Sequence, residues 1–263
     1  MRLKLTLEYA GTRYSGWQIQ QNARTVQGEV EKAIHEATGA DRFELYGSGR
    51  TDAGVHALGQ VAHLDIRAQL PPETLRRRIN DALPADINLL RAEPAPPRFH
   101  ARHDAVARSY LYQIARRRTA FAKPFVWWIK DDCDADRMRA AAKCFVGFRD
   151  FRAFSDDDPA QKSTKVLLES CEVHEDEDLV VIHVEASHFL WKMVRRLVGV
   201  LVAAGKGEMT APGAAALFTA DPRTVAPLTA PAAGLFLERV YYKGDARDVP
   251  LRGAVRIARA WQA

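Results

Sequence analysis

Hydrophobic and polar residues alternate near the start of the chain. The hydrophobic members of this alternation are Leu3, Leu5, Leu7 and Tyr9. A period of two predicts a strand with one buried face. The spacing then changes to three and four, with apolar residues at Val26, Val30, Ala33, Ile34 and Ala37. This pattern predicts a helix that Thr25 can cap and that Gly39 ends.

The rest of the first half continues with the same kinds of element. Strand-like runs cover 43–46, 60–66 and 89–92, and Pro72 and Glu73 open a second helix over 74–82 that ends before Pro84. The order is therefore strand, helix, strand, strand, helix, strand. This order is typical of a ferredoxin-like or RRM-like unit.

The second half repeats this mixed order with larger insertions. Strands are predicted over 109–115, 127–129, 166–174, 179–186 and 234–242, and helices over 135–145, 189–204 and near 213–217. Asp134 can cap the first of these helices. The fold class is therefore α+β, with two ferredoxin-like or RRM-like halves forming a mostly antiparallel mixed sheet flanked by helices.

A proline-rich segment, with Pro94, Pro96 and Pro97, interrupts the periodicity and predicts the domain boundary. We expect an N-terminal half over 1–97, a C-terminal half over 98–244 and a basic tail over 245–263. The tail carries Arg252, Arg256 and Arg259.

The charge distribution favours a polyanionic partner. Net charge is +5, and residues 98–130 hold eight Lys or Arg against the single acid Asp104, which gives that stretch +7. Six aromatic residues are interleaved with these cations: Tyr110, Tyr112, Phe121, Phe125, Trp127 and Trp128. Cations that neutralise phosphates, beside rings that stack on bases, suit a nucleic-acid surface. A solvated basic face over a strand core is the alternative interpretation.

Other function classes lack support in the sequence. The three cysteines, Cys133, Cys144 and Cys171, have no metal-ligand spacing and predict free thiols in a reducing compartment. His100 and His103 could supply two metal ligands, but the sequence has no second His or Cys pair at ligand spacing to complete a metal site. The apolar run 189–204 is interrupted by Lys192, Arg195 and Arg196, so we expect no membrane span, and the chain begins without a signal peptide. The expected location is the cytoplasm.

The glycine-rich segment 47–54 is the most informative local feature. It reads Gly-Ser-Gly-Arg-Thr-Asp-Ala-Gly and places Asp52 two residues after Arg50, between two predicted strands. A dinucleotide-binding loop would need glycine at position 52, and a carboxylate would repel phosphate. Asp52 is therefore either a catalytic carboxylate or an aspartate that caps a turn. His56, just beyond, is more typical of a loop hydrogen-bonder than of a catalytic group.

Two further pairs of residues allow more than one interpretation. Arg195 and Arg196 lie in a mostly apolar predicted helix, where Trp191, Arg195 and Gly199 would share a face. Both arginines are exposed, or one is buried and needs an anion, for which Asp52 is a candidate. Tyr110 and Tyr112 share a strand face beside basic residues, and are either core tyrosines or stacking residues.

Together these segments resemble the TruA family of tRNA pseudouridine synthases over nearly the whole chain. The motifs that carry the resemblance are 8–12, 16–18, 25–27, 47–57, 59–61, 99–102, 108–112, 193–195 with Gly199, and 234–237. The most specific of them is the run Gly-Arg-Thr-Asp-Ala-Gly-Val-His over residues 49–56. The resemblance implies isomerisation of uridine to pseudouridine in the tRNA anticodon arm, at positions 38, 39 and 40.

The resemblance also implies roles for individual residues. Asp52 matches the catalytic aspartate, Arg50 the loop arginine, and Arg195 the helix arginine that pairs with the aspartate. Tyr110 matches the tyrosine that stacks on the target base, whereas Leu235 and Leu237 are expected under that base. Arg102 and Arg108 are expected to bind the RNA. The family implies no metal and no cofactor, and it implies tRNA and a second copy of the chain as partners.

The sequence departs from the family pattern at a few positions, and other functions remain open. Asp156, Asp157 and Asp158 add acid to a loop expected near RNA, and 191–192 is Trp-Lys where histidine is common. The alternatives are a synthase with different target uridines and a catalytically idle RNA-binding protein. A nucleotide-binding enzyme is disfavoured by Asp52.

Overall fold

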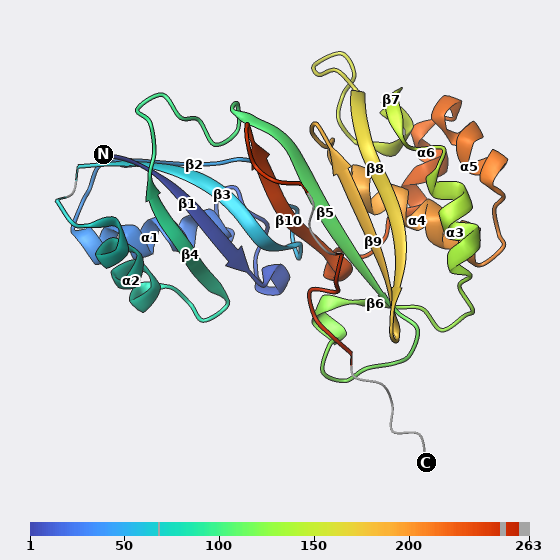
Figure 1. Cartoon of the computed structure of the whole chain (residues 1–263), viewed down its shortest axis with the longest axis horizontal. Helices are drawn as coiled ribbons and strands as arrows, with labels where there is room; N and C mark the ends of the chain where they lie inside the picture. Colours follow the sequence, from blue (N-terminus) through green and yellow to red (C-terminus); the bar gives the residue numbers. More distant parts are fainter. Residues whose placement is uncertain (68, 248–250, 258–263) are drawn as a thin grey trace. The chain divides into compact units, whose positions relative to one another are not determined.

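A computed structural model describes residues 1–67, 69–247 and 251–257, and its chain forms two compact units (Figure 1). The first unit comprises 1–106 with 237–247, and the second comprises 107–236 with the described tail residues 251–257. The expected boundary after residue 97 thus lies inside the first unit. Arg259 of the expected basic tail lies outside the described residues.

The first unit begins with the predicted order of elements. These are β1 (Arg2–Tyr9), α1 (Val26–Thr38), β2 (Phe43–Gly47), β3 (His56–Ile66), α2 (Pro72–Ala82) and β4 (Ile87–Pro94). Strand β1 pairs antiparallel with both β3 and β4, and β2 pairs antiparallel with β3. As predicted, Thr25 Oγ1 accepts from Gly28 N at the start of α1, and Gly39 ends the helix with a φ of 66°.

The second unit contains most of the remaining elements. They are β5 (Ala105–Ala115, which begins in the first unit), β6 (Trp127–Trp128), α3 (Ala135–Ala142), β7 (Gly147–Asp150), β8 (Lys165–Asp176), β9 (Leu179–Ala186), α4 (Met193–Gly205), α5 (Ala211–Ala216) and α6 (Pro222–Val225). The last strand, β10 (Leu235–Tyr242), has its first two residues in this unit and the others in the first. The 3-10 turns are Gly11–Arg13, Lys123–Phe125, Arg152–Phe154, Leu217–Thr219, Ala226–Leu228 and Ala232–Gly234.

The strands of the second unit pair mostly antiparallel. Strand β9 pairs with β5 and β8, and β8 pairs with β7, whereas the short β6 runs parallel to β5. The described residues thus contain ten mostly antiparallel strands and six α-helices. The α+β fold class with a mixed sheet is confirmed.

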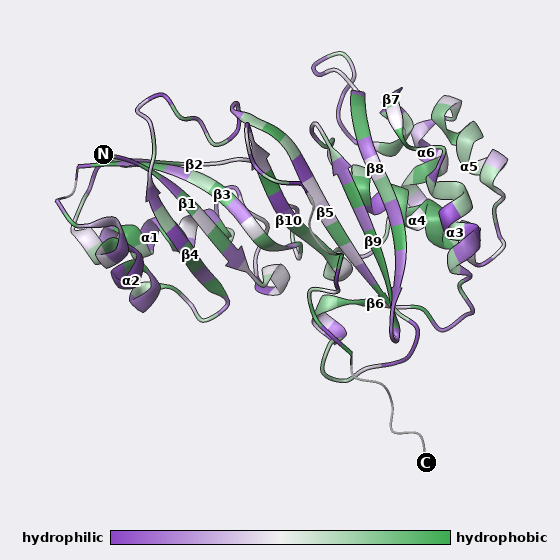
Figure 2. Ribbon diagram, viewed as in Figure 1, coloured by the Kyte–Doolittle hydropathy of each residue, from purple (hydrophilic) through white to green (hydrophobic). Residues whose placement is uncertain are grey.

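The core of the second unit is built on β9 and α4. Every residue of β9 is buried, and Arg195 is the single residue of α4 that is not. Figure 2 shows α4 as a predominantly hydrophobic helix. The helix was predicted to begin at Phe189, but it begins at Met193 because Lys192 takes a φ of 62°, which interrupts helical geometry. Trp191 therefore does not share a helix face with Arg195.

No helix among residues 1–67, 69–247 and 251–257 is long and apolar enough to cross a membrane.

Candidate functional site

The loop between β2 and β3 presents Asp52. Its neighbours Thr51 and Val55 are buried, Arg50 is exposed, and Asp52 itself is half-buried. Gly54 takes a φ of 78°, which explains a glycine at this turn. The loop therefore offers a carboxylate that is partly shielded from water while its backbone is anchored on both sides.

Three hydrogen bonds hold the loop at and beside Asp52. Thr51 O accepts from Trp17 N at 3.1 Å, and Thr51 Oγ1 bonds to the buried Tyr9 hydroxyl at 2.8 Å. On the other side, Gly54 N donates to Tyr14 O at 3.2 Å. Tethers on both sides restrict the backbone of Asp52, and such restriction suits a group that must meet a substrate in a fixed geometry.

A buried polar pair fixes the start of the loop. Ser48 Oγ donates to Gln60 Oε1 at 2.8 Å, and Gln60 Nε2 donates to Gly49 O at 3.1 Å. The Ser48 backbone amide also donates to Val61 O at 2.7 Å. This arrangement gives a physical reason for the Gly-Gln-Val motif at 59–61, because the Gln60 amide ties β3 to the loop.

Glycine at position 16 allows the loop to lie directly against the preceding segment. Gly16 has a φ of 89°, and a Cβ atom there would lie 2.4 Å from Thr51 O. Trp17 beside it is 1% exposed and donates the backbone hydrogen bond to Thr51. The motif 16–18 thus forms the support on which the Asp52 loop rests.

Arg50 and Arg102 border a surface hollow next to the loop. The hollow is shallow and open to solvent, and it is lined by Trp17, Gln18, Gln27, Leu45, Tyr46, Gly47, Gly49, Arg50 and Arg102. Arg50 Nε donates to Gln18 Oε1 at 3.3 Å, and both arginines are exposed. The structure therefore brings Arg50, the predicted loop arginine, and Arg102, a predicted RNA-binding residue, to one hollow in the first unit.

His56 has the structural role that the sequence favoured. It is 1% exposed, and its Nδ1 accepts a hydrogen bond from Gly11 N at 3.0 Å. An acceptor Nδ1 means that this ring nitrogen carries no proton. His56 therefore helps to fix the end of the loop.

The second unit holds Tyr110 and Arg108 on β5. Tyr110 is half-buried and meets Phe189 edge to face at 4.9 Å between ring centroids, a contact that the sequence did not reveal. Tyr112 is fully buried and its hydroxyl donates to Pro231 O at 2.8 Å, so of the two tyrosines it is the core residue. Arg108 Nη1 donates to Ser187 O at 3.0 Å.

The two arginines of α4 differ in environment. Arg195 is half-buried and its Nε donates to Ala230 O at 2.7 Å, while Ala230 N donates back to Arg195 O at 3.0 Å. Arg196 is 2% exposed and forms an ion pair with Asp156. The interpretation of two exposed arginines is therefore wrong for Arg196, and its anion is Asp156.

The three acids of 156–158 are engaged within the second unit. Asp156 also pairs with Lys192 at 2.7 Å, and Asp157 pairs with Lys162 at 3.0 Å while accepting from Trp191 N. Burial raises the pKa of Asp156, but the hydrogen bond from Lys192 and the positive charge of Arg196 lower it by more, so the carboxylate is favoured. The paired cations offset much of the negative charge of this loop, which is expected to lie near RNA.

The remaining predicted residues, Leu235 and Leu237, lie on β10 and are 5% and 1% exposed. The predicted site residues fall into two sets. Arg50, Asp52, Arg102 and Leu237 belong to the first unit, and Arg108, Tyr110, Arg195 and Leu235 to the second.

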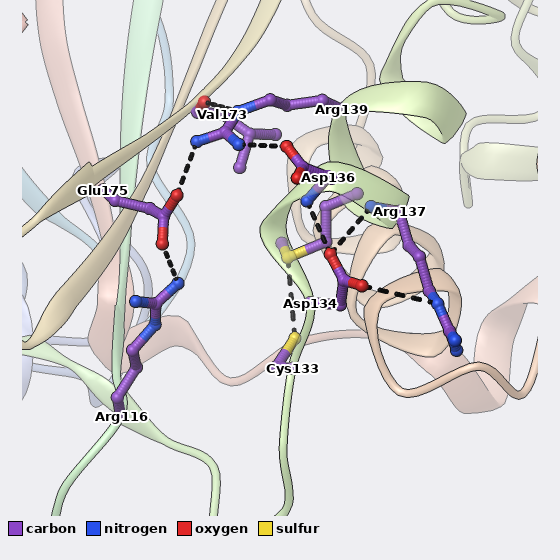
Figure 3. A network of polar contacts seen from close by, with 9 residues as sticks. Arg116, Cys133, Asp134, Asp136, Arg137, Arg139, Val173 and Glu175 are labelled. Atoms are coloured by element: carbon purple, nitrogen blue, oxygen red, sulfur yellow. Dashed lines mark hydrogen bonds and ion pairs between the residues drawn. The ribbon is translucent and has the colours of Figure 1, made fainter.

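The arginine triplet 116–118, part of the basic stretch 98–130, is partly engaged with acids. Arg116 pairs with Glu175, whose other oxygen lies 2.9 Å from Arg139 Nη2 (Figure 3). Arg117 Nε lies 2.6 Å from Asp178 Oδ2. Two of the three cations therefore already have carboxylate partners.

No group of three or more His, Cys, Asp or Glu in the described part of the chain has a geometry that could hold a metal ion. Cys133, Cys144 and Cys171 are all free thiols, and burial raises the pKa of Cys171 to about 12. That thiol is therefore protonated at neutral pH.

Comparison with known proteins identifies the family. A family model described as tRNA pseudouridine synthase matches residues 6–104 and 141–243. The tRNA pseudouridine synthase A of Bradyrhizobium diazoefficiens is 41% identical over 244 residues, covering 92% of this chain and 99% of the relative. The protein of that name from Rhodopseudomonas palustris strain BisB18 is 43% identical, with the same two coverages, and tRNA pseudouridine synthase A 2 of Clostridium tetani is 36% identical, with coverages of 91% and 98%. On this match, and with the Asp52 loop intact, the chain belongs to the TruA family of tRNA pseudouridine synthases.

Proposed function

We propose that this protein converts uridine to pseudouridine in the anticodon arm of tRNA, at positions 38, 39 and 40, with Asp52 as the catalytic carboxylate. The observation that carries the proposal is the half-buried Asp52 on a loop tethered at Thr51 and Gly54. Membership of the TruA family and the conspicuous basic stretch over 98–130 support the same substrate.

The reaction is an isomerisation, so it needs no net oxidant or reductant. The bond between uracil N1 and ribose C1′ breaks, the base turns, and C5 bonds to C1′. The proton on C5 is then lost, and N1 gains one. Asp52, as a carboxylate, is suited to act on the ribose or on the base during these steps.

Other residues are assigned roles that fit their chemistry. Arg50 and Arg195 hold the substrate, because guanidinium groups donate hydrogen bonds to phosphate and carbonyl oxygens. Tyr110 stacks on the target base and moves a proton, Leu235 and Leu237 lie under that base, and Arg102 and Arg108 bind phosphates. Taking the target base out of its stack costs a few kcal/mol, which such pocket contacts offset.

Replacing Asp52 with asparagine tests the catalytic assignment. The Asp52→Asn variant is expected to fold and bind tRNA as the parent does, yet to form no pseudouridine, because an amide is a poor nucleophile and a poor base. The control is Asp41→Asn, which changes an exposed acid in the same unit and should keep full activity. Mass-spectrometric mapping of pseudouridine in a tRNA transcript measures both.

The outcomes separate the alternatives. Turnover by Asp52→Asn at the parental rate would remove Asp52 from the central role. Pseudouridine at other positions would support a synthase with different targets. Binding without turnover by the parent protein would support an idle RNA-binding protein.

We further propose that the protein works as a cytoplasmic homodimer, and that tRNA crosses both copies. Exposed apolar side chains at Phe121 and Trp128, which are 97% and 42% exposed, suit such an interface. Sedimentation at working concentration should give twice the chain mass. A fully active monomer would contradict the dimer.

A further inference from the structure

Four aromatic rings lie in contact beside the Asp52 loop. We name Tyr46, His63, His100 and His103 the ring cluster. Tyr46 stacks on His63 with centroids 5.8 Å apart and planes 21° apart, and it meets the edge of His100 at 5.0 Å. His100 lies 4.8 Å from His63 and 4.2 Å from His103. The cluster thus joins β2, β3 and the segment 99–104.

The inner part of the cluster is fixed by hydrogen bonds. His63 is 2% exposed, and its Nδ1 accepts from Ala101 N at 3.2 Å, while Ala101 O accepts from the Tyr242 hydroxyl at 2.7 Å. Asp104 accepts from His100 N at 2.9 Å. These bonds hold segment 99–104 in place without any contribution from the Tyr46 side chain.

Tyr46, by contrast, is left at the surface. It is 38% exposed although its strand partner His63 is buried, and His103 is exposed as well. Tyr46 also lines the hollow with Gly47, Gly49, Arg50 and Arg102. Nothing lies within 4 Å of a Cβ atom built at Gly49, so another molecule can come close to the backbone there, whereas the Trp17 ring fills that space at Gly47. A ring with an open surface beside two guanidinium groups suits a nucleobase and its phosphate.

The charges around the cluster are compatible with this ligand. Burial, together with the neighbouring positive charges, lowers the pKa of both His63 and His100, so these rings are neutral at neutral pH. Among the nearby acids, Asp65 is paired with Arg2 and Asp104 bonds to the His100 amide, whereas Glu44 is exposed. Arg50 and Arg102 stand at the hollow itself.

We propose that the ring cluster and its hollow form a subsite for a second, unpaired nucleotide of the RNA, whose base stacks on Tyr46 and whose phosphate lies by Arg50 and Arg102. This inference rests on the proposed function, because it takes RNA as the substrate. Since Arg50 is two residues from Asp52, the nucleotide held here neighbours the target uridine. By binding the nucleotide next to the target uridine, the subsite helps to position that uridine.

The competing explanation is that Tyr46 only packs β2 against segment 99–104. The two explanations differ in what the loss of the ring does to RNA binding. Base stacking on an aromatic side chain is lost with the ring and does not depend on released counterions. A packing role changes stability and leaves RNA affinity alone.

The test compares Tyr46→Leu with Tyr46→Phe, both in the Asp52→Asn background so that tRNA is not consumed. Tyr46→Leu should weaken binding of a tRNA transcript by about five- to 100-fold, the range expected for one stacked base. Tyr46→Phe keeps the ring and should stay within about twofold of its parent. The slope of log affinity against log salt should be the same in all three proteins, because no phosphate contact is removed.

A second measurement locates the base. Anticodon arms carrying 2-aminopurine at one loop position at a time should show quenching at one position with the parent, and that quenching should disappear with Tyr46→Leu. The subsite would be overturned if Tyr46→Leu bound tRNA as tightly as its parent, or if the quenching pattern did not change. This holds even if the melting temperature of Tyr46→Leu were lower than that of its parent. Failure of the wild-type protein to form pseudouridine would instead overturn the proposed function.

Discussion

Arg196, a buried residue in the first turn of α4, forms an ion pair with Asp156, which lies at the surface on the loop before β8. The Arg196 side chain is 3% exposed and that of Asp156 is 29% exposed. Within the described residues, Arg196 Nε and Nη1 are buried and have no hydrogen-bond partner. The charge of this guanidinium is therefore balanced by one carboxylate, which also fixes Lys192 at the start of the helix.

Removing that carboxylate should destabilise the protein. Asp156→Asn leaves the buried Arg196 charge uncompensated, which we expect to cost about 3 kcal/mol, the lower end for a broken buried pair because Asp156 is partly exposed. Asp158→Asn is the matched control, since Asp158 is exposed and bonds to Gln161 and the Ala160 amide. Urea unfolding gives both free energies, and equal values for the two variants would contradict the buried-pair account.

The same pair should contribute to stability in a limited range of pH. Burial raises the pKa of Asp156, but Lys192 and Arg196 lower it to a net value below the ordinary one. A carboxyl group with a lowered pKa in the folded state stabilises the protein above its unfolded pKa of about 4, and this contribution is lost as pH falls through the folded value. The free-energy gap between wild type and Asp156→Asn should therefore be constant above about pH 5 and shrink below about pH 4. A gap that does not change down to pH 2 would contradict this linkage.

Local chemistry made several elements predictable. The cap at Thr25 and the left-handed Gly39 determine both ends of α1 within a few residues, and both signals are visible in the sequence. Strand β7 was missed because three of its four residues, Phe148, Arg149 and Asp150, are exposed and so show no alternation. The start of α4 was missed because apolar residues continue through 189–190, while the positive φ of Lys192 depends on contacts outside the helix.

The candidate site likewise contains features that one short segment reveals and contacts that depend on distant parts of the chain. Asp52 and its glycines are recognisable in one short segment, and so is the Trp17 segment that supports them. The partnership of Arg196 with Asp156 spans 40 residues, and no spacing rule connects them. The same is true of Tyr110 and Phe189, which meet because β5 and the segment after β9 are neighbours in the fold.

A side chain at position 16 should disturb the Asp52 loop. Ala at position 16 would place its Cβ 2.4 Å from Thr51 O, so the backbone of the loop must move. A shift of about 1 Å can cost about 100-fold in rate, and we expect a loss of that size in pseudouridine formation. Gly39→Ala is the control, because Gly39 also has a positive φ, of 66°, but nothing lies within 4 Å of the added Cβ.

Both substitutions carry the cost of a positive φ, of about 1 kcal/mol or more, so their melting temperatures should both fall. Activity at 25 °C separates them, since the loop is displaced in Gly16→Ala alone. Full activity of Gly16→Ala, or equal loss in both variants, would show that the contact between Gly16 and Thr51 does not set the position of Asp52.

An arginine that is already paired with an acid should contribute less to the salt dependence of tRNA binding than one that contacts a phosphate. Each true phosphate contact adds about one unit to the slope of log affinity against log salt. Arg116 is paired with Glu175 and Arg117 with Asp178, so changing residues 116–118 to alanine should flatten the slope by about one unit or less. Arg102→Ala, at the exposed hollow, should by itself flatten it by about one unit.

Both variants should still modify the same uridines, because phosphate contacts position RNA and carry little sequence information. Filter binding between 50 and 300 mM salt, roughly the range in which such contacts dominate affinity, measures both slopes. A loss of about three units in the triple variant would mean that Arg116 and Arg117 exchange their carboxylate partners for phosphates when tRNA binds.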